Sequence, residues 1–574
     1  MYLEKINSPA DLKKLSLTEM TALAEEMREA LFNRLTKIGG HFGPNFGMVE
    51  ATIALHYVFN SPVDKFVFDV SHQSYAHKLL TGRKAGYLDD AHFAEDSGYT
   101  NPDESGHDFF NVGHTSTSIA LAAGLAKGRD VLGGKENIIA VIGDGSLSGG
   151  EALEALSVAG SELKSNFIIV VNDNEIAIAE NHGGIYKNLK ELREANGKSS
   201  SNMFRAFGLD YIYEENGNDI GAMIALFEKV KDIDHPVVLH IHTLKGKGYE
   251  IAEKNKEAWH WTLPFDRATG KPTVNFGNGE SYGAITPNWI MERAAKDRKF
   301  VVVTPAMPAS VGLVPELRVK LGPQYLDVGI AEEAAVAVCA GIAKNGGNPL
   351  LVTNMTFLQR AYDQISQDVC INNLPVTMLM NYTSFDGLTD VTHLGIFGLA
   401  VFTNIPNLVV LAPTCAEEYL NMLNWSIEQK SHPVLILIPG NEVFHRSSCV
   451  EEKTFDALDT YKVEKKGEAV AATMKRALGF EPTLINPRFA SGVDKKLLEE
   501  LKKDHELVIT LEDGIVSGGF GEKIASFYGT SNMKVKNYGL EKKFYDRYNP
   551  AELLKELGMS TEQILADVKE ILGK

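Results

Sequence analysis

Short apolar runs and helical segments alternate along the first half of the chain. The runs Phe66 to Val70, Ile138 to Ile142, Phe167 to Val171 and Val237 to His242 have the length and the branched side chains of buried strands. Helical spacing or composition marks the segments 17–37, 48–59, 118–127 and 151–158. The first helix opens with a capping pattern, Ser16 to Glu19. This alternation predicts a parallel sheet that is covered by helices.

The second half repeats the alternation. Apolar runs predict strands at 300–304, 326–328, 350–353, 376–380, 408–411 and 434–438. Helices are expected at Glu332–Lys344, Leu358–Cys370 and Ala416–Glu428. The last segment has shorter strands, at 483–485 and 507–511, and a charged helix at 561–572. These elements predict a second parallel sheet followed by a smaller α/β region.

Two stretches interrupt the alternation and indicate domain boundaries. Residues 261–281 are polar and rich in Gly and Pro, and residues 451–466 are more charged than their surroundings. A chain of 574 residues is long enough for two to four domains. We therefore expect an α/β protein of three domains, with boundaries at 1–265, 291–450 and 451–574 and a linker at 266–290.

Polar side chains follow two of the predicted strands. Asp144 lies between Gly143 and Gly145, directly after one strand, and Asn172-Asp173-Asn174 follows the next. The carboxyl ends of parallel strands meet at one edge of a sheet, and hard oxygen ligands there suit Mg²⁺ that carries a diphosphate. A lone Gly-Asp-Gly is more typical of an ordinary turn, and the dinucleotide fingerprint G-x-G-x-x-G is absent. The second strand end is what favours a metal and diphosphate site.

Histidines recur in loops at strand ends or beside glycine. His41 lies between Gly40 and Gly43, His72 follows the strand that ends near Val70, and His114 follows Gly113. Each alone is typical of a cap or a hydrogen-bonded surface residue. Narrow glycine loops let a ligand approach the backbone closely, so together they predict a binding site.

Composition and charge exclude several classes of partner and cellular location. The net charge of -18 argues against nucleic acid or membrane surfaces as partners, because both require basic faces. The N-terminus has no apolar signal region, and no run approaches the length of a membrane span. The four cysteines, at 339, 370, 415 and 449, form no C-x-x-C pair and indicate reduced thiols. We expect a cytoplasmic protein with a small-molecule substrate.

Several motifs resemble those of thiamine diphosphate enzymes. Gly143-Asp144-Gly145 with Asn174 resembles their diphosphate signature, and Val328 to Glu333 (VGIAEE) is similar to the turn that carries their catalytic glutamate. Longer stretches resemble the 1-deoxy-D-xylulose-5-phosphate synthase family over nearly the whole chain. These stretches are VEATIALHYVFN from Val49, SHQSYAHKLLTGR from Ser71, VGHTSTS from Val112 and TFLQRAYDQ from Thr356. The resemblance implies a diphosphate module first, a pyrimidine module second and a C-terminal transketolase-type domain.

The resemblance also implies a cofactor site and its residues. Asp144, Asn174 and the carbonyl of Ile176 would hold Mg²⁺. Glu332 would hydrogen-bond the aminopyrimidine ring of thiamine diphosphate and favour the tautomer that removes the thiazolium proton. The other residues implied to contact the cofactor are His114, Gly143, Gly145, Ser146 and Phe357. From the sequence alone, Glu332 could equally be an acid favoured by a helix N-terminus.

Four histidines match catalytic histidines of the family: His41, His72, His260 and His393. The family reaction decarboxylates pyruvate and adds the remaining two-carbon unit to the aldehyde of glyceraldehyde 3-phosphate. Histidine suits the proton transfers because its pKa lies near neutrality. A homodimer is implied as well.

The expected acceptor site departs from the family pattern. Arg360 keeps one family arginine, but Asn381-Tyr382 replaces Asp-Arg, and Leu437 to Asn441 replaces a motif with two arginines. The family tyrosine and aspartate become Asn354 and Thr389. Since arginines grip phosphate, we expect an acceptor aldehyde that is unphosphorylated or differently charged, bound by Arg360, Tyr382 and His393.

Other departures lie outside the acceptor site. Ser71 replaces a glycine, residues 213–217 differ, and the regions 181–207 and 466–483 are shorter than usual. Two alternative functions remain: ketol transfer from a ketose donor, as in transketolase, and a cofactor-binding regulatory paralogue without activity. Retention of Glu332 and the four histidines argues against the second.

Overall fold

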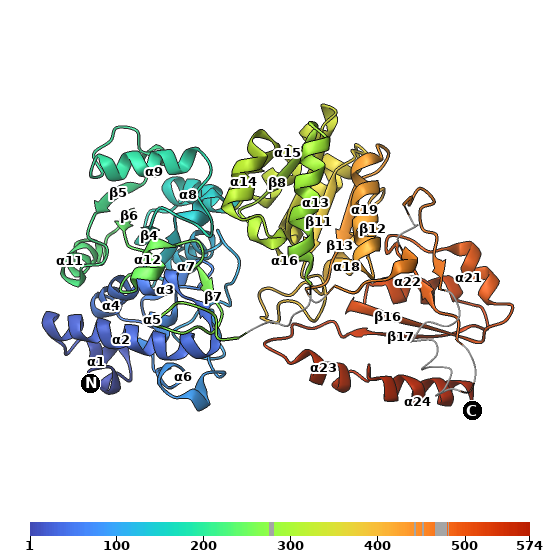
Figure 1. The fold of residues 1–574 in the computed structure, drawn as a ribbon. Helices are drawn as coiled ribbons and strands as arrows, with labels where there is room; N and C mark the ends of the chain where they lie inside the picture. Colours follow the sequence, from blue (N-terminus) through green and yellow to red (C-terminus); the bar gives the residue numbers. More distant parts are fainter. Residues whose placement is uncertain (275–279, 441–442, 450–452, 465–478, 480–481, 574) are drawn as a thin grey trace. The chain divides into compact units, whose positions relative to one another are not determined.

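A computed structural model shows that the chain divides into two compact units (Figure 1). Unit 1 comprises Met1–Asn278 with Gly329–Ala331, and unit 2 comprises Gly279–Val328 with Glu332–Lys574. The structure describes residues 1–573 except 275–279, 441–442, 450–452, 465–478 and 480–481. Among the described residues, no helix is both long and apolar enough to cross a membrane.

Unit 1 is built on a sheet of five parallel strands in the order β2-β3-β4-β6-β5. The strands are β2 (Lys65–Phe68), β3 (Ile138–Gly143), β4 (Phe167–Asp173), β5 (Asp210–Glu214) and β6 (Pro236–His242). The four predicted strands are confirmed. The sequence reading missed β5, which lies at the edge of the sheet and is only partly buried.

Helices cover both faces of this sheet. The helices of unit 1 are α1 (Pro9–Leu12), α2 (Leu17–Ile38), α3 (Gly43–Gly47), α4 (Val49–Val58), α5 (Tyr75–Leu80), α6 (Ala85–Leu88), α7 (Ser118–Leu132), α8 (Gly150–Glu162), α9 (Gly184–Glu194), α10 (Met203–Ala206), α11 (Ile220–Val230) and α12 (Glu250–Lys254). Alternate residues of β3 pack against α7 and α8 on one face and against α4 and α11 on the other. This two-sided burial explains why the strands are continuous apolar runs.

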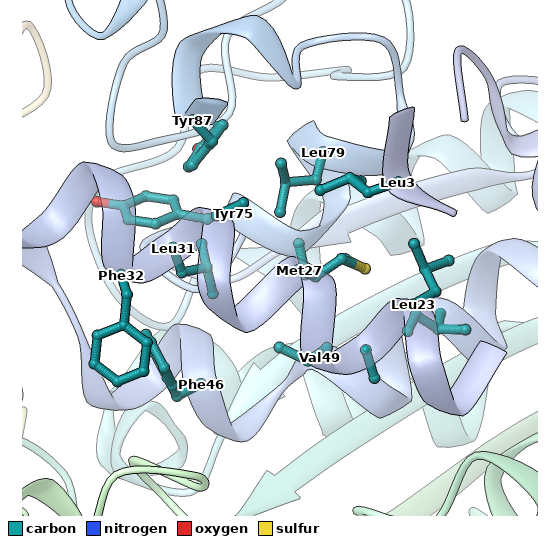
Figure 2. Close-up of a cluster of buried hydrophobic side chains, with 14 of the residues drawn as sticks. Leu3, Leu23, Met27, Leu31, Phe32, Phe46, Val49, Tyr75, Leu79 and Tyr87 are labelled. Atoms are coloured by element: carbon teal, nitrogen blue, oxygen red, sulfur yellow. The ribbon is translucent and has the colours of Figure 1, made fainter. Parts of the chain in front are cut away.

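The long helix α2 organises a further core beside this sheet. It begins with the predicted capping box at Ser16 and ends at Gly39, whose φ of 75° stops the helix. Its buried side chains gather around those of α4 and α5, as Figure 2 shows for Leu23, Met27 and Leu31. This packing places α4 and α5, and with them the histidine loops that flank α3 and α5.

Unit 2 contains a sheet of six parallel strands in the order β12-β13-β11-β10-β8-β9. The strands are β8 (Phe300–Thr304), β9 (Tyr325–Asp327), β10 (Asn348–Asn354), β11 (Thr377–Asn381), β12 (Val409–Leu411) and β13 (Val434–Leu437). Its helices are α13 (Tyr282–Lys296), α14 (Pro315–Leu321), α15 (Glu332–Lys344), α16 (Met355–Leu358), α17 (Tyr362–Gln364), α18 (Gly398–Phe402) and α19 (Ala416–Glu428). All six strands are confirmed, and α15 and α19 have the predicted bounds.

One prediction in unit 2 needs correction. The helix expected at Leu358–Cys370 is a series of short turns: α16, a 3₁₀ turn at Gln359–Ala361, α17 and a π-helix at Ile365–Cys370. Its buried positions are three or four residues apart, a spacing that does not distinguish these helix types. The predicted linker, 266–290, stays a prediction: the two compact units divide within it, after Asn278, and α13 begins inside it at Tyr282 and accommodates Pro287 in its interior.

The C-terminal part of unit 2 has smaller sheets. The strands β14 (Lys462–Val463) and β15 (Ile485–Asn486) pair antiparallel, and β16 (Leu507–Ile515) and β17 (Lys534–Leu540) pair in parallel. The helices are α21 (Lys495–Leu501), α22 (Phe520–Tyr528), α23 (Pro550–Glu556) and α24 (Thr561–Leu572). The predicted charged helix is confirmed as α24. Most of the shortened stretch 466–483 lies outside the described residues.

Candidate active site

The two predicted polar strand ends lie side by side in unit 1. Gly143 at the end of β3 is in register with Asn172 on β4, and the Asp144 amide donates to the Asn172 carbonyl at 3.0 Å. Asp144 and Asn174 are both buried. The strand order of the sheet therefore brings the acid and the amide to one edge, as the sequence predicts.

An unsatisfied oxygen at this edge fits a divalent cation. Asn174 Oδ1 is buried without a hydrogen-bond partner among the described residues, a situation that a metal ligand would resolve. Burial and the nearby Asp173 carboxylate raise the pKa of Asp144 to about 7. Within the described residues no three His, Cys, Asp or Glu side chains form a metal cluster, so a cation here would need amide and carbonyl oxygens in addition to the Asp144 carboxylate.

Glycines allow the turn after Asp144 to fit against its neighbours. A Cβ on Gly145 would lie 2.6 Å from the Ala177 side chain, and one on Gly149 would lie 2.1 Å from Ser116 Oγ. Ser116 Oγ donates to the Ser146 carbonyl at 2.8 Å. The loop of His114 and the Gly-Asp-Gly turn, both predicted to contact the cofactor, are thus held together.

Asp69, at the end of the β2 segment, fixes the same loop. Its buried carboxylate accepts the backbone N–H groups of Ser116 and Ser118 at 2.8 and 2.9 Å. Burial raises the pKa of Asp69, while these hydrogen bonds oppose the shift. The sequence reading did not single out Asp69, although an acid directly after an apolar strand was an available signal.

Three of the four predicted catalytic histidines form one cluster in unit 1. The ring centroids of His41, His72 and His260 are 5.0 to 5.5 Å apart. The antiparallel pair β1 (Gly40–His41) and β7 (Trp261–Thr262) brings the first and third together. Burial, with Lys245 and the other two rings, lowers the pKa of His260 well below its usual value, so this imidazole is neutral near pH 7.

Asn45 holds the backbones of two of these histidines. Its side-chain amide donates to the carbonyls of His41 and His72, both at 2.7 Å, and its oxygen accepts the Tyr75 amide at 2.9 Å. The Asn45 side chain is fully buried. The sequence reading missed this residue because its partners are separated from it by as many as 30 positions.

A buried lysine is a further group that the sequence reading missed. Lys245 Nζ donates to the Ala177 carbonyl at 2.5 Å, beside the proposed metal loop. Burial lowers the pKa of Lys245 to about 7, opposed by the Asp144 carboxylate. The Lys-Gly-Lys-Gly sequence after β6 was the available signal.

The serine at 71 occupies a backbone conformation that favours glycine. Its φ is 63°, in the left-handed region. Ser71 Oγ donates to the Val112 carbonyl at 2.6 Å and accepts the Thr100 amide at 2.8 Å. These two hydrogen bonds offset the backbone strain next to His72.

Unit 2 carries the other predicted residues near the carboxyl ends of its strands. Glu332 opens α15 with a buried carboxyl group, and Arg360 Nη1 lies 3.3 Å from it. Burial raises the pKa of Glu332, and the Arg360 charge opposes the shift. Phe357 and His393 are in edge contact, with ring centroids 5.6 Å apart. The arginine that was expected to bind the acceptor is therefore paired with the glutamate.

Tyr382 fills the position where the family pattern has an arginine. It follows β11 with a φ of 54°, and a Cβ on Gly440 would lie 2.7 Å from its ring. Burial raises the pKa of the Tyr382 phenol, so the side chain is neutral. Asn354 Oδ1 is buried without a partner among the described residues. Asn441, another altered position, lies outside the described residues.

Comparisons with known proteins match three family models along this chain and relatives that cover all of it. The family model described as 1-deoxy-D-xylulose-5-phosphate synthase matches residues 3–201 and 195–243. The transketolase pyrimidine-binding and C-terminal domain models match residues 281–444 and 466–564. The order of these matches confirms the predicted three-domain α/β architecture.

Two curated relatives share one name. The 1-deoxy-D-xylulose-5-phosphate synthase of Caldanaerobacter subterraneus is 35% identical, with 100% of both chains covered. That of Clostridium beijerinckii is 36% identical, with 98% of both covered. A solved transketolase from Campylobacter jejuni is 17% identical, covers 98% of this chain and 100% of its own, and has a TM-score of 0.41.

Proposed function

Because the chain belongs to the 1-deoxy-D-xylulose-5-phosphate synthase family of thiamine-diphosphate-dependent transferases, we propose that it decarboxylates pyruvate and transfers the two-carbon unit to an aldehyde without a phosphate group. Tyr382 carries the acceptor part of this proposal. A neutral, half-buried phenol packed on Gly440 stands where the family pattern has a phosphate-binding arginine. Arg360, the arginine that is kept, is already paired with Glu332.

Residues of unit 1 would hold the cofactor through its diphosphate. Asp144, Asn174 and the Ile176 carbonyl would bind Mg²⁺, and the turn at Gly145 and Ser146 would face the phosphates. The buried, unsatisfied Asn174 oxygen supports this assignment. When bound, thiamine diphosphate supplies the electron sink for decarboxylation and carbon–carbon bond formation.

The remaining side chains would bind and orient reactants and move protons. Glu332 would hold a proton toward the aminopyrimidine, a role that its raised pKa supports. His41, His72 and His260 would donate to the oxygens of donor and acceptor. A neutral His260 can donate from one ring nitrogen while the other accepts. His393, in contact with Phe357, is the fourth histidine that we propose takes part.

We also propose a cytoplasmic homodimer. Ala334, Ala337, Val338 and Gly341 form an exposed, uncharged face of α15, which suits packing against another helix. The four cysteines are buried and free, as expected for a reducing compartment. Sedimentation velocity at micromolar concentration tests the assembly: a species of the monomer mass of 62.9 kDa would contradict the dimer.

Steady-state assays test the acceptor proposal. With pyruvate as donor, glyceraldehyde should be used at least as efficiently as glyceraldehyde 3-phosphate, and carbon dioxide should be released in step with product. Dependence on a ketose donor without carbon dioxide would instead indicate transketolase-type transfer. A kcat/KM for the phosphorylated aldehyde far above that for glyceraldehyde would overturn the proposal.

A substitution at Tyr382 sharpens this test. A charge-assisted hydrogen bond contributes about 1.5 to 3 kcal/mol, so Tyr382→Arg should raise kcat/KM for the phosphorylated aldehyde roughly 10- to 100-fold. Tyr382→Phe is the matched control, because it keeps the ring and adds no charge. Equal responses of both variants would show that charge at this position does not select the acceptor.

A further inference from the structure

A short segment of unit 1 contacts both strand ends of the proposed metal site. Asn181 donates to Asp144 Oδ2 at 2.7 Å and accepts the Ala177 amide at 2.8 Å. Tyr186 Oη, on α9, donates to the Gly145 carbonyl at 3.0 Å. Farther along α9, Arg193 forms an ion pair with Asp173. One helix and the residues before it thus reach both the Gly-Asp-Gly turn and the Asn-Asp-Asn strand end.

The helix α9 is fixed in unit 1 by its own packing. Leu189 and Leu192 are buried in the core that also contains α7, α8 and one face of the sheet. The Asn188 side chain donates to the Ser201 carbonyl at 2.9 Å and accepts the Met203 amide at 3.1 Å. These hydrogen bonds connect α9 to the start of α10. The shortened region 181–207 therefore forms ordered helical structure against the sheet.

Arg193 and its partners determine the conformation around Asn174. Asp173 is fully buried. Its Oδ2 forms the ion pair with Arg193 and a hydrogen bond with His240 Nε2 at 2.9 Å. Its Oδ1 accepts the Glu175 amide at 3.0 Å. Arg193 Nη2 lies 3.4 Å from the Glu175 carboxylate, and the φ of Glu175 is 71°. Both neighbours of Asn174 are held in place, while Asn174 Oδ1 keeps no partner among the described residues.

We propose that α9 is a built-in clamp on the cofactor anchor, in which Arg193 and Tyr186 are positioning residues for the Mg²⁺–diphosphate site. This inference rests on the proposed assignment of Asp144, Asn174 and Ile176 as that site. Arg193 fixes the Asn-Asp-Asn end and Tyr186 fixes the carbonyl of the Gly-Asp-Gly turn. Groups that orient metal ligands typically alter metal affinity 10- to 100-fold when removed.

Binding measurements on the full-length apoprotein test the clamp. Isothermal titration with thiamine diphosphate in excess Mg²⁺ should give a Kd raised about 10- to 100-fold in Arg193→Gln and severalfold in Tyr186→Phe. The loss should appear mainly in cofactor affinity, so excess thiamine diphosphate and Mg²⁺ should restore most of the turnover that either variant loses at limiting cofactor. Lys190→Gln is the matched control, since Lys190 is exposed on the same helix and pairs only weakly with Glu194, at 3.7 Å. Its Kd should be unchanged.

Two comparisons separate the possible failures. Titration with Mg²⁺ and inorganic pyrophosphate probes the anchor alone, and wild-type protein that does not bind it would overturn the proposed metal site. Wild-type binding with equal Kd values in Arg193→Gln and Tyr186→Phe would overturn only the clamp. If Arg193→Gln does not fold, Tyr186→Phe decides, because it removes a single hydroxyl; an unchanged Kd in that variant would contradict the clamp.

Discussion

At the scale of single residues, the candidate site depends on polar side chains, mostly buried, whose hydrogen bonds hold its loops in place. Asn45, Asp69 and Arg193 each hold a loop that carries a proposed functional residue. Each hydrogen bond contributes only about 1 kcal/mol net, but an unmade one in the interior costs 1 to 3 kcal/mol. Substitutions that leave such a partner unpaired should therefore affect both stability and the geometry of the site.

Asn45→Asp is the sharpest test of this idea. The substitution keeps the shape but replaces an amide that donates to two carbonyls by a carboxylate that cannot donate. We expect a loss of about 2 to 4 kcal/mol in unfolding free energy, from urea titration, and at least a tenfold fall in kcat. The exposed Asn255→Asp should change neither quantity. An active, fully stable Asn45→Asp protein would show that the histidine loops do not need this amide.

At the scale of elements, a buried ionic network joins α5 to the loop that follows it. The Asp108 carboxylate forms a hydrogen bond with His77 Nε2 at 2.8 Å. It also accepts hydrogen bonds from both terminal nitrogens of Arg83, at 2.6 and 2.9 Å. His77 also contacts His56, and burial lowers the pKa of both imidazoles. His77 and Arg83 both come from the SHQSYAHKLLTGR motif, so the network explains these two positions.

Removing the Arg83 charge alone should destabilise the protein more than removing the charges of Arg83 and Asp108 together. Arg83→Met leaves a buried, uncompensated Asp108 charge and should destabilise unit 1 by about 3 to 5 kcal/mol. Adding Asp108→Asn should recover part of that loss, because the charge is removed as well. Guanidinium unfolding of the single and double variants measures the coupling. Additive losses would contradict a direct interaction of the two side chains.

The capping of α22 predicts a pH dependence. Glu512 accepts the amides of Phe520 and Gly521 at 2.8 and 3.0 Å, yet burial raises its pKa to about 7. The folded state then holds a proton that the unfolded state loses near pH 4.5. The stability contribution is therefore complete below pH 4.5 and lost as the pH rises through 7, on the order of 3 kcal/mol in total.

Thermal unfolding between pH 5 and 8 measures this effect. Glu512→Gln keeps an acceptor without the ionisation and should flatten the pH dependence of the transition that includes α22. The exposed Glu506→Gln is the control and should retain the wild-type profile. Identical profiles for the wild type and Glu512→Gln would contradict the shifted pKa.

The same scale shows what the sequence could and could not predict. Strands such as β3 and β4, and helices such as α15, were predictable because burial on both faces or on one stripe leaves a clear apolar period. The irregular turns between Phe357 and Cys370 were not, since their apolar spacing fits several helix types. Asn45 and Arg193 were not recognisable either, because their partners are distant in sequence and meet only in the folded sheet.

At the scale of the whole molecule, the net charge of the chain affects how the cofactor diphosphate can bind. A chain with a charge of -18 repels a free diphosphate, so cofactor binding requires local compensation. In unit 1 the buried Lys245 lies beside the proposed metal loop, and burial brings its pKa to about 7, so at neutral pH it is only partly charged. The charge of Arg193 is already paired with Asp173. Mg²⁺ would therefore supply most of the positive charge that the diphosphate needs.

Ligand-linked stability measures this dependence directly. A ligand at 100 times its Kd stabilises the folded state by about 2.7 kcal/mol, so thiamine diphosphate with Mg²⁺ should raise the melting temperature of the wild-type protein. EDTA should abolish most of the rise, and thiamine, which has no diphosphate, should produce none with or without the metal. Asn174→Ala should lose the response to Mg²⁺ while its melting temperature without ligands stays close to that of the wild type, because the Asn174 oxygen has no partner to lose among the described residues. A full response in EDTA would show that protein groups alone neutralise the diphosphate.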